Sequence, residues 1–108
     1  MKRPPLTPRY GRNILKIIKE RLERSPYPFV NVLLFGSCAQ GKATLESDID
    51  IAIICNPFDR SRVKETVAFY GLLRDLDTRI EIIVLHPDDL ENRYSTIVQE
   101  VKRHGVAA

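Results

Sequence analysis

Residues 33–54 read LLFGSCAQGKATLESDIDIAII, and this stretch decides the fold. An apolar strand is predicted to break at Gly36-Ser37, and a second strand is predicted to open on Asp48 and Asp50, one residue apart. Side chains of a strand alternate between its two faces, so both aspartates project to the same side. Two carboxylates this close repel each other unless a cation lies between them. The stretch therefore predicts a cation site where the second strand begins.

The segment between the two strands is compact, and we interpret it as a short helical turn that starts at Ser37 and runs through Leu45. Backbone N–H groups at a helix start have no intrahelical partner, so they and the Ser37 hydroxyl could hold a phosphate. Magnesium prefers a few carboxylate oxygens together with water and phosphate. The pattern is typical of a site for a nucleoside triphosphate and magnesium. The alternative is a plain strand-to-helix turn with Ser37 as its N-cap.

The rest of the chain alternates helices and strands. Apolar residues at helical spacing predict amphipathic helices, and β-branched and aromatic runs predict strands. We expect helices at 8–24, 60–77 and from 87 to a stop at Gly105, and strands at 29–35, 50–55 and 80–85. This order predicts an α/β domain whose sheet is covered mainly on one side, which leaves the other face for the site. One domain is expected over 1–108, with loose ends at 1–7 and 105–108.

One ionisable residue lies inside the apolar strand predicted at 80–85. Glu81 stands among isoleucine, valine and leucine residues, and a carboxylate there requires a partner. One interpretation is that Glu81 lies on an exposed strand face beside Arg79 or a helix lysine.

The motif as a whole resembles the minimal nucleotidyltransferases of the DNA polymerase beta superfamily. It consists of Gly36-Ser37, ten intervening residues, and Asp48-Ile49-Asp50, with further matches at Ala39, Gly41 and Ser47. The resemblance implies a nucleotidyltransferase fold with a small mixed sheet. It also implies transfer of a nucleoside monophosphate from a triphosphate such as ATP to a hydroxyl, with two Mg²⁺ ions bound and pyrophosphate leaving.

The resemblance also suggests a role for each matching residue. Asp48, Asp50 and Glu81 would be the catalytic, metal-binding carboxylates. The nucleotide-binding residues would be Gly36, Ser37, Gly41, Lys42 and Ser47. Two positions depart from the family pattern, because Glu81 stands where Asp is usual and Gln40 where many relatives carry a basic residue. A shift of about 1 Å in a catalytic group can cost about 10²-fold in rate, and a lost charge weakens phosphate stabilisation.

Composition and charge exclude some classes of protein. No apolar run approaches the ~20 residues of a membrane span, and the basic start lacks the apolar stretch of a secretory signal, so we expect a cytoplasmic protein. The two cysteines form no metal-type pair, which agrees with a reducing compartment. Residues 1–24 hold eight Lys or Arg against two Glu, a local +6, whereas 25–108 hold nine against twelve, a local −3. The basic block is either a solvated helix face or a surface that steers toward RNA or an acidic partner.

The acceptor of the nucleotide is not encoded in a recognisable motif. Small stand-alone domains of this kind resemble the antitoxins of HEPN-type ribonuclease toxins, which implies a helical toxin partner, ATP as donor and a tyrosine of the toxin as acceptor. One alternative is a binding module that neutralises a protein partner by contact. Another is transfer to a small molecule or an RNA end. The chain could also form a homo- or hetero-oligomer.

Overall fold

The computed structural model describes residues 4–108. Its elements follow along the chain as α1 (Pro8–Arg24), β1 (Phe29–Phe35), α2 (Gly36–Ala39), β2 (Ile49–Cys55), α3 (Arg62–Leu73), β3 (Ile80–Leu85), the 3₁₀ helix η1 (Pro87–Glu91), α4 (Thr96–His104) and β4 (Val106–Ala107).

The sheet is mixed, with the strand order β3-β2-β1-β4. β1 runs antiparallel to both β2 and β4, whereas β2 and β3 are parallel. Parallel neighbours require a crossover, and α3 provides it. In the parallel register Asp50 lies opposite Glu81, and Ala52 lies opposite Ile83. Side chains of directly paired residues in neighbouring strands point to the same face, so Asp50 and Glu81 project from the same side of the sheet.

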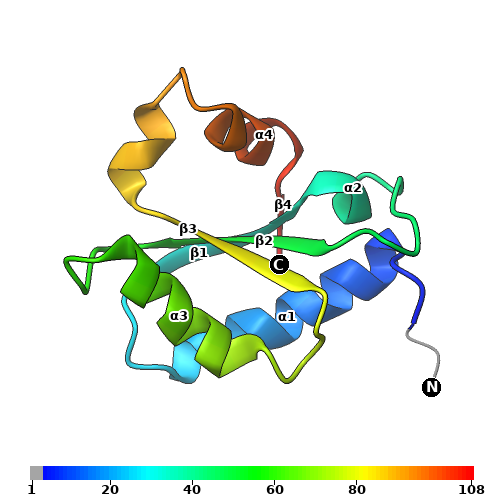
Figure 1. Ribbon diagram of the computed structural model, residues 1–108, viewed down its shortest axis with the longest axis horizontal. Helices are drawn as coiled ribbons and strands as arrows, with labels where there is room; N and C mark the ends of the chain where they lie inside the picture. The colour runs from blue at the N-terminus through cyan, green and yellow to red at the C-terminus, as the bar shows by residue number, and fades with distance from the viewer. Residues whose placement is uncertain (1–3) are drawn as a thin grey trace.

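The two faces of the sheet are covered differently (Figure 1). The long helices α1 and α3 lie on one face, where Leu15, Ile18 and Phe69 are fully buried against β2 side chains such as Ile51 and Ile53. The opposite face carries α4, which packs Val98 and Val101 onto a smaller apolar cluster. The expected α/β fold, with a small mixed sheet flanked mainly on one side by helices, is confirmed in this arrangement.

Side chains of α3 protect the outer edge of β3. The Ile82 N–H donates to the Tyr70 hydroxyl at 2.8 Å, and the Val84 carbonyl accepts from the Arg62 guanidinium at 3.4 Å. An unpaired strand edge is a template for pairing with other chains, so these contacts disfavour strand addition at β3. They also fix the strand that carries Glu81.

The predicted bounds of α1, β1 and β3 agree with the structure, but three other elements were predicted wrongly. α2 begins at Gly36 and ends at Ala39, one turn only, because the chain turns at Gly41 with φ +74°. α3 begins at Arg62 because the Ser61 side chain caps it, and it ends at Leu73 rather than at residue 77.

The third error concerns the last predicted helix, which is in fact two helices. The Asn92 side chain accepts from the Tyr94 N–H, and Ser95 then caps α4. Local side-chain acceptors of this kind compete with a continuous helix. Tyr94 is consequently 90% exposed instead of lying on an apolar helix face.

Both ends of the described chain have defined contacts. Val106–Ala107 pairs with β1, and the Pro4 carbonyl accepts from the Arg79 guanidinium at 2.9 Å. The first three residues of the arm expected at 1–7 lie outside the described residues. Within 4–108, no helix has both the length and the apolar character that crossing a bilayer requires.

Candidate active site

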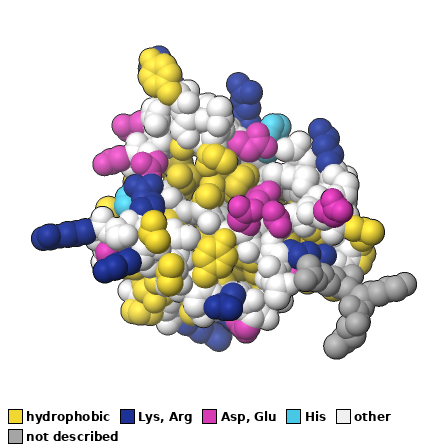
Figure 2. All heavy atoms as spheres, in the orientation of Figure 1, with side chains coloured by type: hydrophobic (Ala, Val, Ile, Leu, Met, Phe, Trp, Pro, Cys, Tyr) yellow, Lys and Arg dark blue, Asp and Glu magenta, His cyan; other side chains and the backbone are white. Residues whose placement is uncertain are grey.

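Three carboxylates converge where β2 and β3 begin. Asp48 directly precedes β2, Asp50 is its second residue, and Glu81 is the second residue of β3. One oxygen from each of the three lies within 4.8 Å of the others. The parallel pairing is the cause, because it places the starts of both strands at the same edge of the sheet. Figure 2 shows acidic side chains gathered near the middle of the face that it draws, with an apolar surface beside them.

Gly36 lies against Asp50. Phe35, which precedes it, pairs with Asp50 across β1 and β2, so the chain turns directly beside this carboxylate. A Cβ at position 36 would collide with Asp50 Oδ2, and the backbone there has φ +74°, a conformation that favours glycine. The motif glycine is therefore required for two independent reasons. The turn at Gly36 and the carboxylate of Asp50 are therefore packed together as one structural unit.

The environment of the three groups disfavours their joint ionisation. Burial raises the pKa of Asp50, and the charges of Asp48 and Glu100 add to this effect. The pKa of Glu81 is raised as well, first by the hydrogen bond that its protonated form makes with Asp48, then by burial, and then by the charges of Asp48 and Asp50. A cation among these oxygens would remove the repulsion.

The donor set fits a hard divalent cation. It consists of carboxylate oxygens alone, which suit Mg²⁺, Mn²⁺ or Ca²⁺ rather than a soft metal. Asp48 and Glu81 are exposed and Asp50 is half-buried, so water or a phosphate oxygen has access to complete the coordination. Within residues 4–108, no ion pair joins Glu81 to Arg79 or to a helix lysine. Arg79 is 9% exposed and pairs with Asp77 instead.

The predicted nucleotide-binding residues occupy different positions around the carboxylates. Ser37 lies within α2, whose N-cap is Phe35, so its hydroxyl does not cap the helix. Gly41 makes the turn that ends this segment, and Lys42 is exposed beyond it. Ser47 is half-buried and accepts from the Thr44 N–H at 2.8 Å, which orders the loop before Asp48. Gly36 lies directly against Asp50, whereas Ser47, the neighbour of Asp48 in the chain, has a partner within its own loop.

One residue near the site gave no signal in the sequence. Glu100 of α4 accepts from the Gln40 amide at 3.2 Å, and its charge contributes to the raised pKa of Asp50. A glutamate in an amphipathic helix is ordinary. Only the packing of α4 over this face of the sheet reveals its position.

A second trio with ligand-type atoms, Cys55, Glu65 and His86, lies where β2 and β3 end. The Arg62 guanidinium is 2.9 Å from His86 Nδ1, and because a guanidinium only donates, Nδ1 accepts and Nε2 carries the proton. Nε2–H then donates to Glu65 at 2.7 Å, and the other Glu65 oxygen accepts from the Phe58 N–H.

These bonds satisfy the buried carboxylate of Glu65. Burial alone would raise the pKa of Glu65, but the hydrogen bonds hold it below its usual value. Burial, followed by the Glu65 charge, raises the pKa of the Cys55 thiol to about 11, so the thiol stays neutral. We interpret this trio as a structural network that joins α3 to the sheet.

Comparisons with known proteins identify a family and similar solved structures. A family profile described as "Polymerase beta, Nucleotidyltransferase" matches residues 16–107. No curated protein gives a match to the chain. Among solved structures, a candidate nucleotidyltransferase from Sulfolobus solfataricus is 21% identical with a TM-score of 0.58, and the match covers 99% of this chain and 89% of that one.

Two further solved structures are of toxin–antitoxin systems. One, a toxin–antitoxin with AMP-PNP, is 27% identical with a TM-score of 0.56, covering 88% of this chain and 71% of that chain. The other, a mutant of the MntA–HpeT toxin–antitoxin, is 24% identical with a TM-score of 0.57 and the same two coverages.

Proposed function

Because the chain belongs to the polymerase beta family of nucleotidyltransferases, we propose that it transfers a nucleoside monophosphate from a nucleoside triphosphate to a hydroxyl group with Mg²⁺ bound. The observation that carries the proposal is the convergence of Asp48, Asp50 and Glu81 beside the Gly36 turn. ATP is the proposed donor, since a similar structure is described with AMP-PNP. We place the reaction in the cytoplasm.

Each residue has a proposed role in the reaction. Asp48, Asp50 and Glu81 would hold two Mg²⁺ ions, which when bound supply charge neutralisation of the phosphates and activation of the acceptor hydroxyl. Backbone N–H groups at Gly36 and Ser37 would position the β and γ phosphates, with Gly41 shaping the loop and Lys42 adding positive charge. Ser47 would act indirectly, by ordering the loop that leads to Asp48.

The bonds of the proposed step balance without a further reactant. The acceptor oxygen forms a bond to the α phosphorus, and the bond from that phosphorus to the bridging oxygen of pyrophosphate breaks. Glu81 would ligate the ion that activates the acceptor hydroxyl, and it is the proposed acceptor of the hydroxyl proton. Pyrophosphate leaves, and the products are the nucleotidylated acceptor and a proton.

We further propose that the acceptor is a tyrosine of a helical HEPN-type toxin and that the chain is its antitoxin. Support comes from the similar structures described as toxin–antitoxin systems. The test is to incubate the full chain with ATP, Mg²⁺ and the product of the adjacent gene, and to weigh that product by intact-mass spectrometry. A gain of one adenylyl group that maps to a tyrosine supports the proposal, and an unchanged mass contradicts it.

A second candidate function is contact-based neutralisation of a partner, with weak or no turnover. The observation that favours it is Gln40, whose amide is bonded to Glu100 where many relatives offer a basic side chain. This candidate predicts that a variant lacking both Asp48 and Asp50 still neutralises the toxin in a growth assay. The transferase proposal predicts that the same variant fails. Transfer to a small molecule or an RNA end would instead give a labelled product other than the partner protein.

A further inference from the structure

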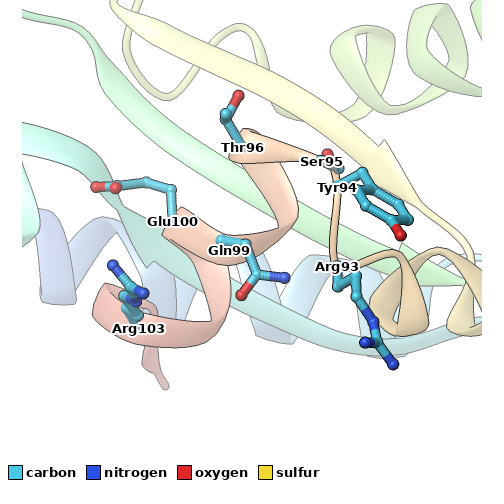
Figure 3. A pocket seen from close by; sticks show the side chains of 7 residues that line it. All are labelled: Arg93, Tyr94, Ser95, Thr96, Gln99, Glu100 and Arg103. Atoms are coloured by element: carbon cyan, nitrogen blue, oxygen red, sulfur yellow. The ribbon is translucent and has the colours of Figure 1, made fainter.

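Glu100 extends from α4 toward the catalytic face of the sheet. Its carboxylate accepts from the Gln40 amide at 3.2 Å, just after α2. Glu100 also lines a cavity of about 320 Å³ along α4. Figure 3 shows its side chain directed away from Arg93 and Tyr94, which line the same cavity. Gln40 thus holds Glu100 beside the phosphate turn.

The charge of Glu100 is not neutralised locally. Arg103 lies three residues further along α4, yet within residues 4–108 no ion pair involves Glu100 or any of the three site carboxylates. The Gln40 N–H donates to the Gly36 carbonyl at 3.3 Å, and Gly36 lies against Asp50. Through its bond to Gln40, Glu100 therefore brings a fourth negative charge to the turn that contacts Asp50.

We propose that Glu100 is a positioning residue of the active site, which through its charge favours the binding of divalent cations and opposes the binding of the anionic nucleotide. This inference rests on the proposed nucleotidyltransferase function and adds a regulatory element to it. Its consequence is that the site needs a higher concentration of divalent cations to accept a triphosphate than it would need without Glu100, because the cations offset four carboxylates.

The physical argument gives effects of opposite sign. A carboxylate near Asp50 attracts a cation that binds alone, so its removal weakens cation affinity. The same carboxylate repels MgATP²⁻, so its removal strengthens nucleotide affinity. One charge beside a partly exposed site should change each affinity by about two- to fivefold at low salt. Loss of a merely structural contact would instead weaken both affinities or leave both unchanged.

The experiment measures two dissociation constants on the full chain by calorimetry. Mn²⁺ is titrated alone, and α,β-methylene-ATP is titrated in excess Mg²⁺, an analogue whose α–β bond cannot be cleaved. The test variant is Glu100→Gln, which removes the charge and keeps a hydrogen-bonding side chain for Gln40. Glu100→Asp keeps the charge and serves as the conservative rescue. Glu91→Gln makes the same chemical change at an exposed residue of η1 and serves as the matched control.

We expect Glu100→Gln to bind Mn²⁺ about two- to fivefold more weakly and the nucleotide analogue about two- to fivefold more tightly, with the Asp and control variants within about twofold of the wild type. Higher salt should shrink both effects. Equal affinities in Glu100→Gln and wild type, or changes of the same sign, would overturn the inference and leave the proposed function intact. A wild type that binds neither ligand would overturn the proposed function together with the inference.

Discussion

At the residue scale, Asp50 combines three constraints that rarely coincide. It lies on β2 opposite Glu81, it is half-buried, and the turn at Gly36 leaves room for it only because position 36 has no side chain. Ionised carboxylates with raised pKa values destabilise the folded state until a cation binds. The negative charge of Asp50 that would bind the cation therefore lowers the stability of the cation-free protein.

Asp50→Asn should abolish nucleotide transfer and also stabilise the cation-free protein. The rate should fall below about 1% of the wild type, since a cation ligand is lost. Without divalent cations, the free energy of unfolding at pH 7 should rise by roughly 0.5 kcal/mol, because like-charge repulsion is relieved. Urea titrations in EDTA and a transfer assay in Mg²⁺ measure the two effects. Full activity, or a loss of stability, would contradict the role assigned to Asp50.

The raised pKa values of Asp50 and Glu81 also fix the sign of a pH dependence. Their contribution to stability is present at low pH, where both groups are protonated, and is lost as the pH rises through their folded-state pKa values. Asp50→Asn should therefore gain most over the wild type at neutral pH and little under acid conditions. A saturating divalent cation should remove the difference.

Gly36→Ala should damage the fold and the site together. The positive φ costs roughly 1–2 kcal/mol for a residue with a Cβ, and the collision with Asp50 adds to this cost. We expect a loss of at least about 1 kcal/mol in urea unfolding, accompanied by weaker Mn²⁺ binding. Gly71→Ala is the matched control, because this glycine lies within α3 with open space around it and should stabilise by up to about 1 kcal/mol.

At the element scale, the strand that carries Glu81 is held at both ends by polar networks. The Glu65–His86 network secures its end, and Asp77 secures its start. Asp77 accepts from Arg79 through both carboxylate oxygens and from the Tyr10 hydroxyl of α1. These contacts link α1 to the approach to β3, so they position the strand edge where the carboxylates meet.

The Asp77 network gives a pH-dependent contribution to stability. The hydrogen bond from the Arg79 guanidinium lowers the pKa of Asp77 to about 2 in the folded protein. The contribution of Asp77 to stability is therefore present above its unfolded-state pKa, and it is lost as the pH falls through the folded-state pKa. Asp77→Asn should cost roughly 1–2 kcal/mol at pH 7, and the difference from wild type should shrink between pH 4 and 2. Urea unfolding at several pH values measures it. A pH-independent difference would show that the carboxylate charge is not the cause.

At the scale of the whole molecule, the proposed active site joins β2, β3 and the turn into α2, so a bound ligand should stabilise the entire fold. A ligand that binds only the folded state stabilises it by about 2.7 kcal/mol at 100 times its dissociation constant. We expect Mg²⁺ with ATP to raise the thermal midpoint of the wild type and to leave an Asp48→Asn, Asp50→Asn double variant unchanged. Thermal scans at fixed protein concentration test this, with Glu91→Gln as the control that should respond like wild type.

The sequence by itself determined the strands at Phe29–Phe35 and Ile80–Leu85 and the first helix, because these follow from local periodicity. It also determined that Asp48 and Asp50 project to the same side, because side chains alternate along one strand. The tertiary structure alone decided that Glu81 meets the two aspartates, since this depends on the parallel register between strands that are distant in sequence. It also decided the approach of Glu100 to Gln40, the Asp77 network and the break in the last helix. Contacts across the sheet and between helices have no periodic signature, and competing local hydrogen bonds are settled only when the chain packs.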